Sequence, residues 1–124
     1  MSAEPLYVVV AFIQPFQLER VVDALRLRPN FPGLSVSEVR GFGRHAAHAP
    51  QRGERTEVDP FELRTRIEIY CRREELDGIV DSITTNARTG NPGDGKIFSS
   101  QIQSALRIRT GETDAAALLG GAVT

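Results

Sequence analysis

The sequence predicts an α+β fold of the ferredoxin-like class, a βαββαβ sandwich in which two helices cover one face of an antiparallel sheet. Two observations lead to this prediction: two strand–helix–strand halves follow one another, and one long segment without periodicity separates them. The length of 124 residues, with 40% apolar and 25% charged residues, suits one globular domain with a buried core. We place this domain at residues 1–112.

The first half begins with an uninterrupted apolar run, LYVVVAFI, at residues 6–13. This run is rich in β-branched side chains and stops before Pro15, which predicts a central strand buried on both faces. An amphipathic helix follows, because apolar residues recur at i, i+3, i+4 and i+7. These residues are Leu18, Val21, Val22 and Leu25. The prolines and glycine of residues 28–33 end the helix, and residues 34–40 are expected to form the second strand.

A long segment without sustained period runs from Gly41 to about residue 62. Loops of more than about 12 to 15 residues in a small domain are usually functional or disordered. We therefore expect residues 42–62 to form a functional loop rather than a passive connection.

The second half begins with a half-buried strand at residues 63–71, where the side chains alternate between two faces. The face expected to be buried carries Leu63, Thr65, Ile67, Ile69 and Cys71. Helical spacing then predicts a helix at residues 74–88, and a glycine-rich turn leads into a last strand at residues 97–102. Residues 107–109 are expected to continue the extended path, and residues 113–124 to form a mobile tail.

One face of the predicted sheet has no helix to cover it. Burial against identical neighbours is a natural solution, so the sequence predicts a homo-oligomer.

The charge balance and hydropathy exclude several classes of protein. With 15 basic and 16 acidic residues the net charge is -1, whereas a dedicated nucleic-acid-binding domain shows a basic excess. No segment approaches the roughly 18 apolar residues of a membrane span, and the amino terminus lacks a signal-peptide pattern. We therefore expect a cytoplasmic protein without direct membrane insertion. The single cysteine, Cys71, excludes an internal disulfide.

The first candidate for ligand binding is the lone lysine, Lys96, since the other basic residues are all arginines. Residues 90–96, GNPGDGK, match the first part of a phosphate-binding P-loop. A true P-loop is excluded, because Ile97 stands where Ser or Thr is needed and because this loop runs from helix to strand. Glycines still allow N–H groups to converge on an anion beside a lysine. The alternative is a helix cap followed by a turn.

The second candidate is the pair of arginines at positions 107 and 109. On an extended segment Arg107 and Arg109 would project to the same side and could clamp a polyphosphate through their forked donors. The alternative is a solvated strand face. The residues alone leave open whether this pair meets Lys96.

The third candidate is a pair of histidines, His45 and His48, in the long loop. Their spacing suits a transition metal if the loop turns helically. A third ligand would have to come from Glu54, Glu57, Asp59 or another subunit, and a solvated loop is the alternative. No serine lies in a nucleophile-elbow setting, and neither histidine has an evident nucleophile, so we expect no enzymatic activity.

Together these segments resemble the PII signal-transduction proteins. The resemblance is carried by AFIQPFQLERVVDAL, LSVSEVRGFGR, the RIEI strand, ARTGNPGDGKIF and ALRIRTGE, which cover roughly residues 6–112. It implies a homotrimer of ferredoxin-like subunits with sites for ATP, ADP or AMP in the clefts between them. It also implies that the long loop is the T-loop, which docks on a target protein according to the nucleotide bound. We expect the target to be a membrane transporter.

The resemblance also assigns the nucleotide contacts residue by residue. Those implied at the phosphates are Gly93, Asp94, Gly95, Lys96, Arg107 and Arg109. Ser35 would lie near the adenine and Glu68 on the strand that flanks this pocket. Gly43 and Arg44 would begin the T-loop over the phosphates.

Departures from the family pattern bear on the second ligand. His45, also expected to contact the nucleotide, stands where nitrogen-sensing members have a glutamine that helps to hold magnesium and 2-oxoglutarate. Arg64 replaces a lysine that meets the 2-oxoglutarate carboxylate. No tyrosine occurs between residues 41 and 69, so uridylylation is not expected. Magnesium, 2-oxoglutarate and bicarbonate stay open as ligands, and the alternative function is a metal-responsive (His45 and His48) or bicarbonate-responsive binding protein.

Overall fold

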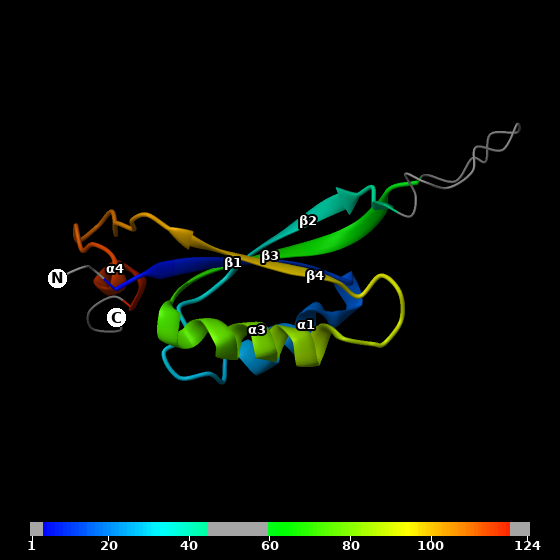
Figure 1. The fold of residues 1–124 in the computed structure, drawn as a ribbon, viewed down its shortest axis with the longest axis horizontal. Coiled ribbons are helices and arrows are strands. Elements are labelled where there is room, and N and C mark those ends of the chain that lie inside the picture. Colours follow the sequence, from blue (N-terminus) through cyan, green and yellow to red (C-terminus); the bar gives the residue numbers. More distant parts are fainter. Residues whose placement is uncertain (1–3, 45–59, 120–124) are drawn as a thin grey trace, which may run out of the picture.

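Four antiparallel strands form one sheet in the computed structural model, which describes residues 4–44 and 60–119. The strand order is β2-β3-β1-β4. The strands are β1 (Leu6–Ile13), β2 (Ser35–Gly41), β3 (Glu62–Arg72) and β4 (Gly95–Ile102). Helices α1 (Leu18–Leu25) and α3 (Arg73–Ala87) lie side by side on one face of the sheet (Figure 1). This arrangement confirms the predicted ferredoxin-like sandwich.

The central strand β1 is buried by the helices on one face only. Its fully buried side chains are Val9, Ala11 and Ile13, each no more than 1% exposed. On the opposite face Val10 and Phe12 are only half-buried. Both helices lie on the other side, so the prediction that β1 is buried on both faces is wrong within a single chain.

The predicted alternation of β3 holds except at one end. Its helix-facing residues Thr65, Ile67, Ile69 and Cys71 are at most 3% exposed. Leu63, expected on the same buried face, is 61% exposed. The reason is that β2 and β3 run together beyond the ends of both helices, as Figure 1 shows.

The chain after β4 differs from the prediction. Residues 107–109 do not continue the extended path, because residues 108–110 form a turn. Two backbone hydrogen bonds of 2.8 Å close this turn. The Arg107 N–H donates to the Glu112 carbonyl oxygen, and the Gly111 N–H donates to the Arg107 carbonyl oxygen. Part of the predicted tail then forms a short helix, α4 (Ala115–Leu119), which packs against β3.

The face of the sheet without helices, called here the open face, carries an apolar strip. Cross-strand partners share a face, so Phe12 and Val10 on β1 lie there with Lys96 and Phe98 on β4. The rings of Phe12 and Phe98 meet edge to face at 6.3 Å, and Phe98 is 55% exposed. Within the described residues, no helix is long and apolar enough to cross a membrane.

Candidate functional site

The glycine loop, residues 88–94, connects α3 to β4 at one end of the molecule. Gly90 and Gly93 have φ values of 88° and 92°, and Gly95, the first residue of β4, has a φ of 112°. L side chains are strained in such conformations, so the loop depends on glycine. Gly95 is also required because there is no room for a side chain: a Cβ there would lie 1.8 Å from the carbonyl oxygen of Phe12.

The carboxylate of Asp94 closes the glycine loop on itself. It accepts hydrogen bonds from the N–H groups of Thr89 and Gly90, at 2.8 and 2.9 Å, and from the Thr89 hydroxyl. The same hydroxyl oxygen accepts a bond of 3.1 Å from the Asn91 N–H. The pKa of Asp94 is lowered from 3.8, mainly by the hydroxyl bond from Thr89 and next by its N–H. The loop is therefore held by an ionised carboxylate at neutral pH.

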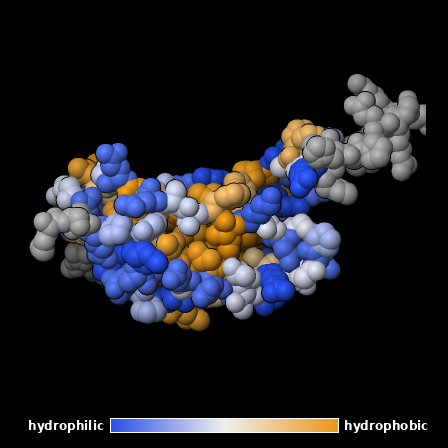
Figure 2. Space-filling model, viewed as in Figure 1, coloured by the Kyte–Doolittle hydropathy of each residue, from blue (hydrophilic) through white to orange (hydrophobic). Residues whose placement is uncertain are grey.

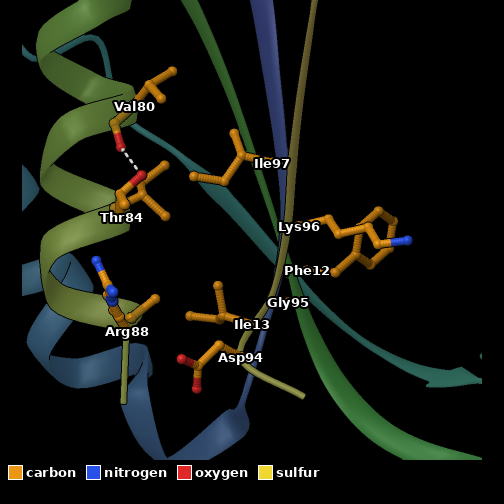
Figure 3. A pocket seen from close by; sticks show the side chains of 11 residues that line it. Phe12, Ile13, Val80, Thr84, Arg88, Asp94, Gly95, Lys96 and Ile97 are labelled. Carbon is orange, nitrogen blue, oxygen red and sulfur yellow. Dashed lines mark hydrogen bonds between the residues drawn. The ribbon is translucent and has the colours of Figure 1, made fainter. Parts of the chain in front are cut away.

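Lys96 follows the loop as the second residue of β4 and pairs with Phe12. The side chains of Lys96 and Phe12 lie on the open face, whereas those of Asp94, Ile13 and Ile97 point toward α3 (Figure 3). The only lysine and the loop's only carboxylate therefore face opposite sides of the sheet.

A hollow of about 470 Å³ lies between α3, β1 and β4, beside the glycine loop. Its walls are mainly apolar and include Val80, Ile83 and Ile97. The apolar band between the sheet and α3 in Figure 2 marks this region. Because the Lys96 ammonium is directed to the other face, the hollow is not where this cation would meet an anion.

Two side chains, Gln14 and Arg64, approach Gly93 from outside the loop. Gln14, which follows β1, donates from Nε2 to the Gly93 carbonyl oxygen at 2.7 Å. The Arg64 guanidinium is also adjacent, since a Cβ on Gly93 would lie 3.3 Å from its NH2 group. Arg64 is paired with Glu62 at 2.5 Å. Sequence reasoning missed Gln14, whose only signal was its position opposite the loop in an antiparallel pair.

The residues assigned to the adenine, Ser35 and Glu68, are direct cross-strand partners on β2 and β3. Glu68 also binds two residues that sequence reasoning missed, accepting bonds of 2.5 Å from Tyr70 and from Arg66. These bonds, that from Tyr70 first, lower the pKa of Glu68 from 4.5, and the Glu68 carboxylate raises the pKa of Tyr70 above 10.0. Alternation along β3 was the available signal, because residues two apart share a face.

The arginines assigned to the phosphates, Arg107 and Arg109, lie far from the glycine loop of the same chain. They follow the opposite end of β4 (Figure 1). A strand rises about 3.3 Å per residue, so the ends of this eight-residue strand lie about 23 Å apart. Within one chain, therefore, the structure does not bring these arginines to Lys96.

Arg107 is held by its own chain. Its NH2 group donates to the Ala117 carbonyl oxygen of α4 at 3.0 Å. Its Nε lies 3.6 Å from the Glu112 carboxylate and makes no hydrogen bond within the described residues. Arg109 is exposed in the adjoining turn.

The base of the long loop is described, but its middle is not. Gly43 and Arg44 follow β2, and the rings of Phe42 and Phe61 lie 5.2 Å apart where the two loop ends meet. His45 and His48 lie outside the described residues, so the predicted metal site is not tested. Residues 4–44 and 60–119 contain no group of three or more His, Cys, Asp or Glu that could hold a metal.

The arrangement suits recognition of an anion. A glycine-rich backbone, closed by Asp94 and bonded by Gln14, precedes Lys96 directly in the chain and lies beside the Arg64 guanidinium. The loop's own carboxylate is occupied by backbone groups and directed to the other face. A second pair of cations, Arg107 and Arg109 at the turn after β4, could join this site only from another copy of the chain.

Comparisons with known proteins identify one family. The family model described as "Nitrogen regulatory protein P-II" matches residues 6–112. The chain is 43% identical to nitrogen regulatory protein GlnK of Escherichia coli K12 over 111 residues, or 89% of this chain and 97% of that protein. It is 46% identical to nitrogen regulatory protein P-II of Rhodobacter capsulatus over 106 residues, 85% of this chain and 93% of that protein.

A solved structure shares the fold. The crystal structure of Arabidopsis thaliana PII bound to citrate superimposes with a TM-score of 0.72 and 32% identity, and the match covers 92% of each chain.

Proposed function

The chain belongs to the family of nitrogen regulatory protein P-II, and from this premise we propose that it is a sensor of adenine nucleotides, not an enzyme. The observation that carries the proposal is the closed glycine loop with Lys96 beside it, an arrangement suited to phosphate. ATP, ADP and AMP share this chemistry.

The nucleotide sites lie between subunits of a homotrimer in this proposal. Two features support it: the glycine loop and the turn after β4 lie at opposite ends of one chain, and the open face carries exposed apolar side chains. A neighbour that covers this face can bring its Arg107 and Arg109 to the Lys96 of the first chain. Closed symmetry then produces three equivalent clefts.

The signal passes through the long loop, residues 42–62. A nucleotide that prefers one loop arrangement shifts the population toward it, in proportion to its differential affinity for the two arrangements. Gly43, Arg44 and His45 stand at the start of this loop, shortly after β2 in the sequence, and would couple it to the phosphates. The loop then docks on a partner protein, which we propose to be a membrane transporter.

Isothermal titration with ATP, ADP and AMP tests the proposal, with and without magnesium, 2-oxoglutarate or bicarbonate. We expect binding of at least one adenine nucleotide, and a loss of at least tenfold in Lys96→Ala, about 1.4 kcal/mol. Arg26→Ala removes an equal charge from the exposed surface of the molecule and should leave the affinity unchanged. A folded wild-type trimer without affinity for any adenine nucleotide would refute the proposal.

A further inference from the structure

Asp94 does not behave as a residue that wraps a phosphate, although it lies in the middle of the glycine–lysine motif. Its carboxylate already accepts three hydrogen bonds, all from Thr89 and Gly90 at the beginning of the same loop. Figure 3 shows the Asp94 carboxylate on the side of α3 and the Lys96 side chain on the open face. Asp94 is thus directed away from the cation that would attract a phosphate.

Charge leads to the same conclusion. A carboxylate turned toward a phosphate would repel it, and the repulsion would grow as water leaves the site. Bonds from the Thr89 hydroxyl and from two N–H groups instead stabilise the ionised Asp94, whose pKa is lowered. The negative charge strengthens the loop without facing the ligand.

From this geometry we infer that Asp94 is the positioning residue of the glycine loop, acting on the nucleotide only through the backbone that it closes. The inference rests on the proposed function. Asp94 and Thr89 form one unit, because the Thr89 hydroxyl donates to the carboxylate and accepts from the Asn91 N–H. Gln14 holds the opposite side of the loop at Gly93.

A loop held in this way is organised before the ligand arrives. Ordering a loop during binding costs conformational entropy and lowers the affinity. Gly90, Gly93 and Gly95 make the free backbone permissive, so the closing carboxylate matters more here than in a loop of stiffer residues.

A double-mutant cycle on nucleotide affinity tests this inference. Asp94→Asn removes the negative charge and leaves one acceptor oxygen in place of two, and Thr89→Val removes the hydroxyl. Each variant should bind ATP about tenfold more weakly, and the double variant should be little worse than either one. The loss should be equal with and without magnesium. Thr89→Ser, which keeps the hydroxyl, should restore most of the affinity.

Thr84→Val is the matched control. Thr84 is on α3, and its hydroxyl donates to the Val80 carbonyl oxygen, outside the glycine loop. The substitution should leave nucleotide affinity unchanged. Amide hydrogen exchange of the free protein adds a second measurement, in which the Thr89 and Gly90 amides should exchange faster in Asp94→Asn than in wild type.

The outcomes separate the alternatives. Additive losses, or a loss confined to the magnesium complex, would show that Asp94 touches the phosphates or their metal and would overturn the inference alone. Unchanged affinity in Asp94→Asn would show that Asp94 stabilises the turn without affecting the nucleotide, and would overturn the inference as well. A wild-type protein that binds no adenine nucleotide overturns the proposed function and this inference together.

Discussion

Gly95 is the glycine of the site that tolerates substitution least. A Cβ at this position would lie 1.8 Å from the Phe12 carbonyl oxygen, and the backbone has a φ of 112°. Gly95→Ala must therefore separate the start of β4 from β1. We predict a loss of about 3 kcal/mol or more in the free energy of unfolding, measured by urea denaturation.

Gly90→Ala is the control for Gly95→Ala. Gly90 also has a positive φ, 88°, but a Cβ there meets nothing within 4 Å. This substitution should cost only the strain of the conformation, about 1–2 kcal/mol. Equal losses in the two variants would show that contact with β1 is not what requires glycine at position 95.

The Glu68–Tyr70 pair gives stability a defined pH dependence. The pKa of Glu68 lies below 4.5 in the folded protein, first because of the bond from Tyr70 and then because of Arg66. The charged carboxylate therefore stabilises the fold above about pH 4.5, and this contribution is lost as the pH falls through the lowered pKa. Tyr70→Phe should be less stable than wild type at neutral pH, and the difference should narrow in acid.

Denaturation at constant protein concentration, from about pH 7 to about pH 3, measures this difference. Tyr7→Phe serves as the control, because the Tyr7 ring lies beneath the Arg73 guanidinium. Its difference from wild type should stay constant over this range. If the difference in unfolding free energy between Tyr70→Phe and wild type does not change with pH, the ionised Glu68 is not what the Tyr70 hydroxyl stabilises.

At the scale of elements, the turn after β4 gives Arg107 and Arg109 different structural roles. Arg107 donates to the Ala117 carbonyl oxygen and so ties α4 to the turn, whereas Arg109 is exposed. Both substitutions, Arg107→Ala and Arg109→Ala, should weaken nucleotide binding. Only Arg107→Ala should also accelerate amide exchange in α4, and equal exchange in the two variants would show that Arg107 does not anchor this helix.

The regular elements could be predicted from the sequence because their periods are strong. The apolar run of β1 and the alternation of β3 required only local patterns, and the structure reproduces both within one or two residues. The turn after β4 could not be predicted, since the alternation of Arg107 and Arg109 looks the same in a strand and in a turn. Gly111, with a φ of 75°, was the overlooked signal.

Burial was predicted less well, because it depends on which elements lie nearby. Leu63 fits the alternation of β3 but lies beyond the ends of both helices. Val10 and Phe12 fit a strand buried on both faces, yet one chain has helices on one side only. No periodicity within the sequence contains this information.

The candidate site was predicted only in part. The motif of glycines and Lys96 could be identified from spacing, but the direction of the Asp94 side chain and the contact from Gln14 follow from the pairing of β1 with β4. The bonds of Glu68 to Arg66 and Tyr70 could be identified only from the positions of the side chains.

At the scale of the whole molecule, the proposed nucleotide site depends on a second copy of the chain. Lys96 lies near one end of β4, and Arg109 lies in the segment after the other end; by the strand rise the two ends of β4 are about 23 Å apart. The exposed Phe98 and its neighbours on the open face offer an apolar surface for that copy. The proposed nucleotide site is complete only in the assembly.

Mixing two defective variants tests this claim most directly. Trimers of Lys96→Ala and trimers of Arg109→Ala are dissociated, mixed in equal amounts and reassembled. Native mass spectrometry verifies that mixed trimers have formed, and ATP binding to the mixture is then titrated. If each site takes its loop from one chain and its turn from the next, random mixing should restore about a quarter of the sites to wild-type affinity. Verified mixed trimers that bind no better than either parent would contradict a site shared between subunits.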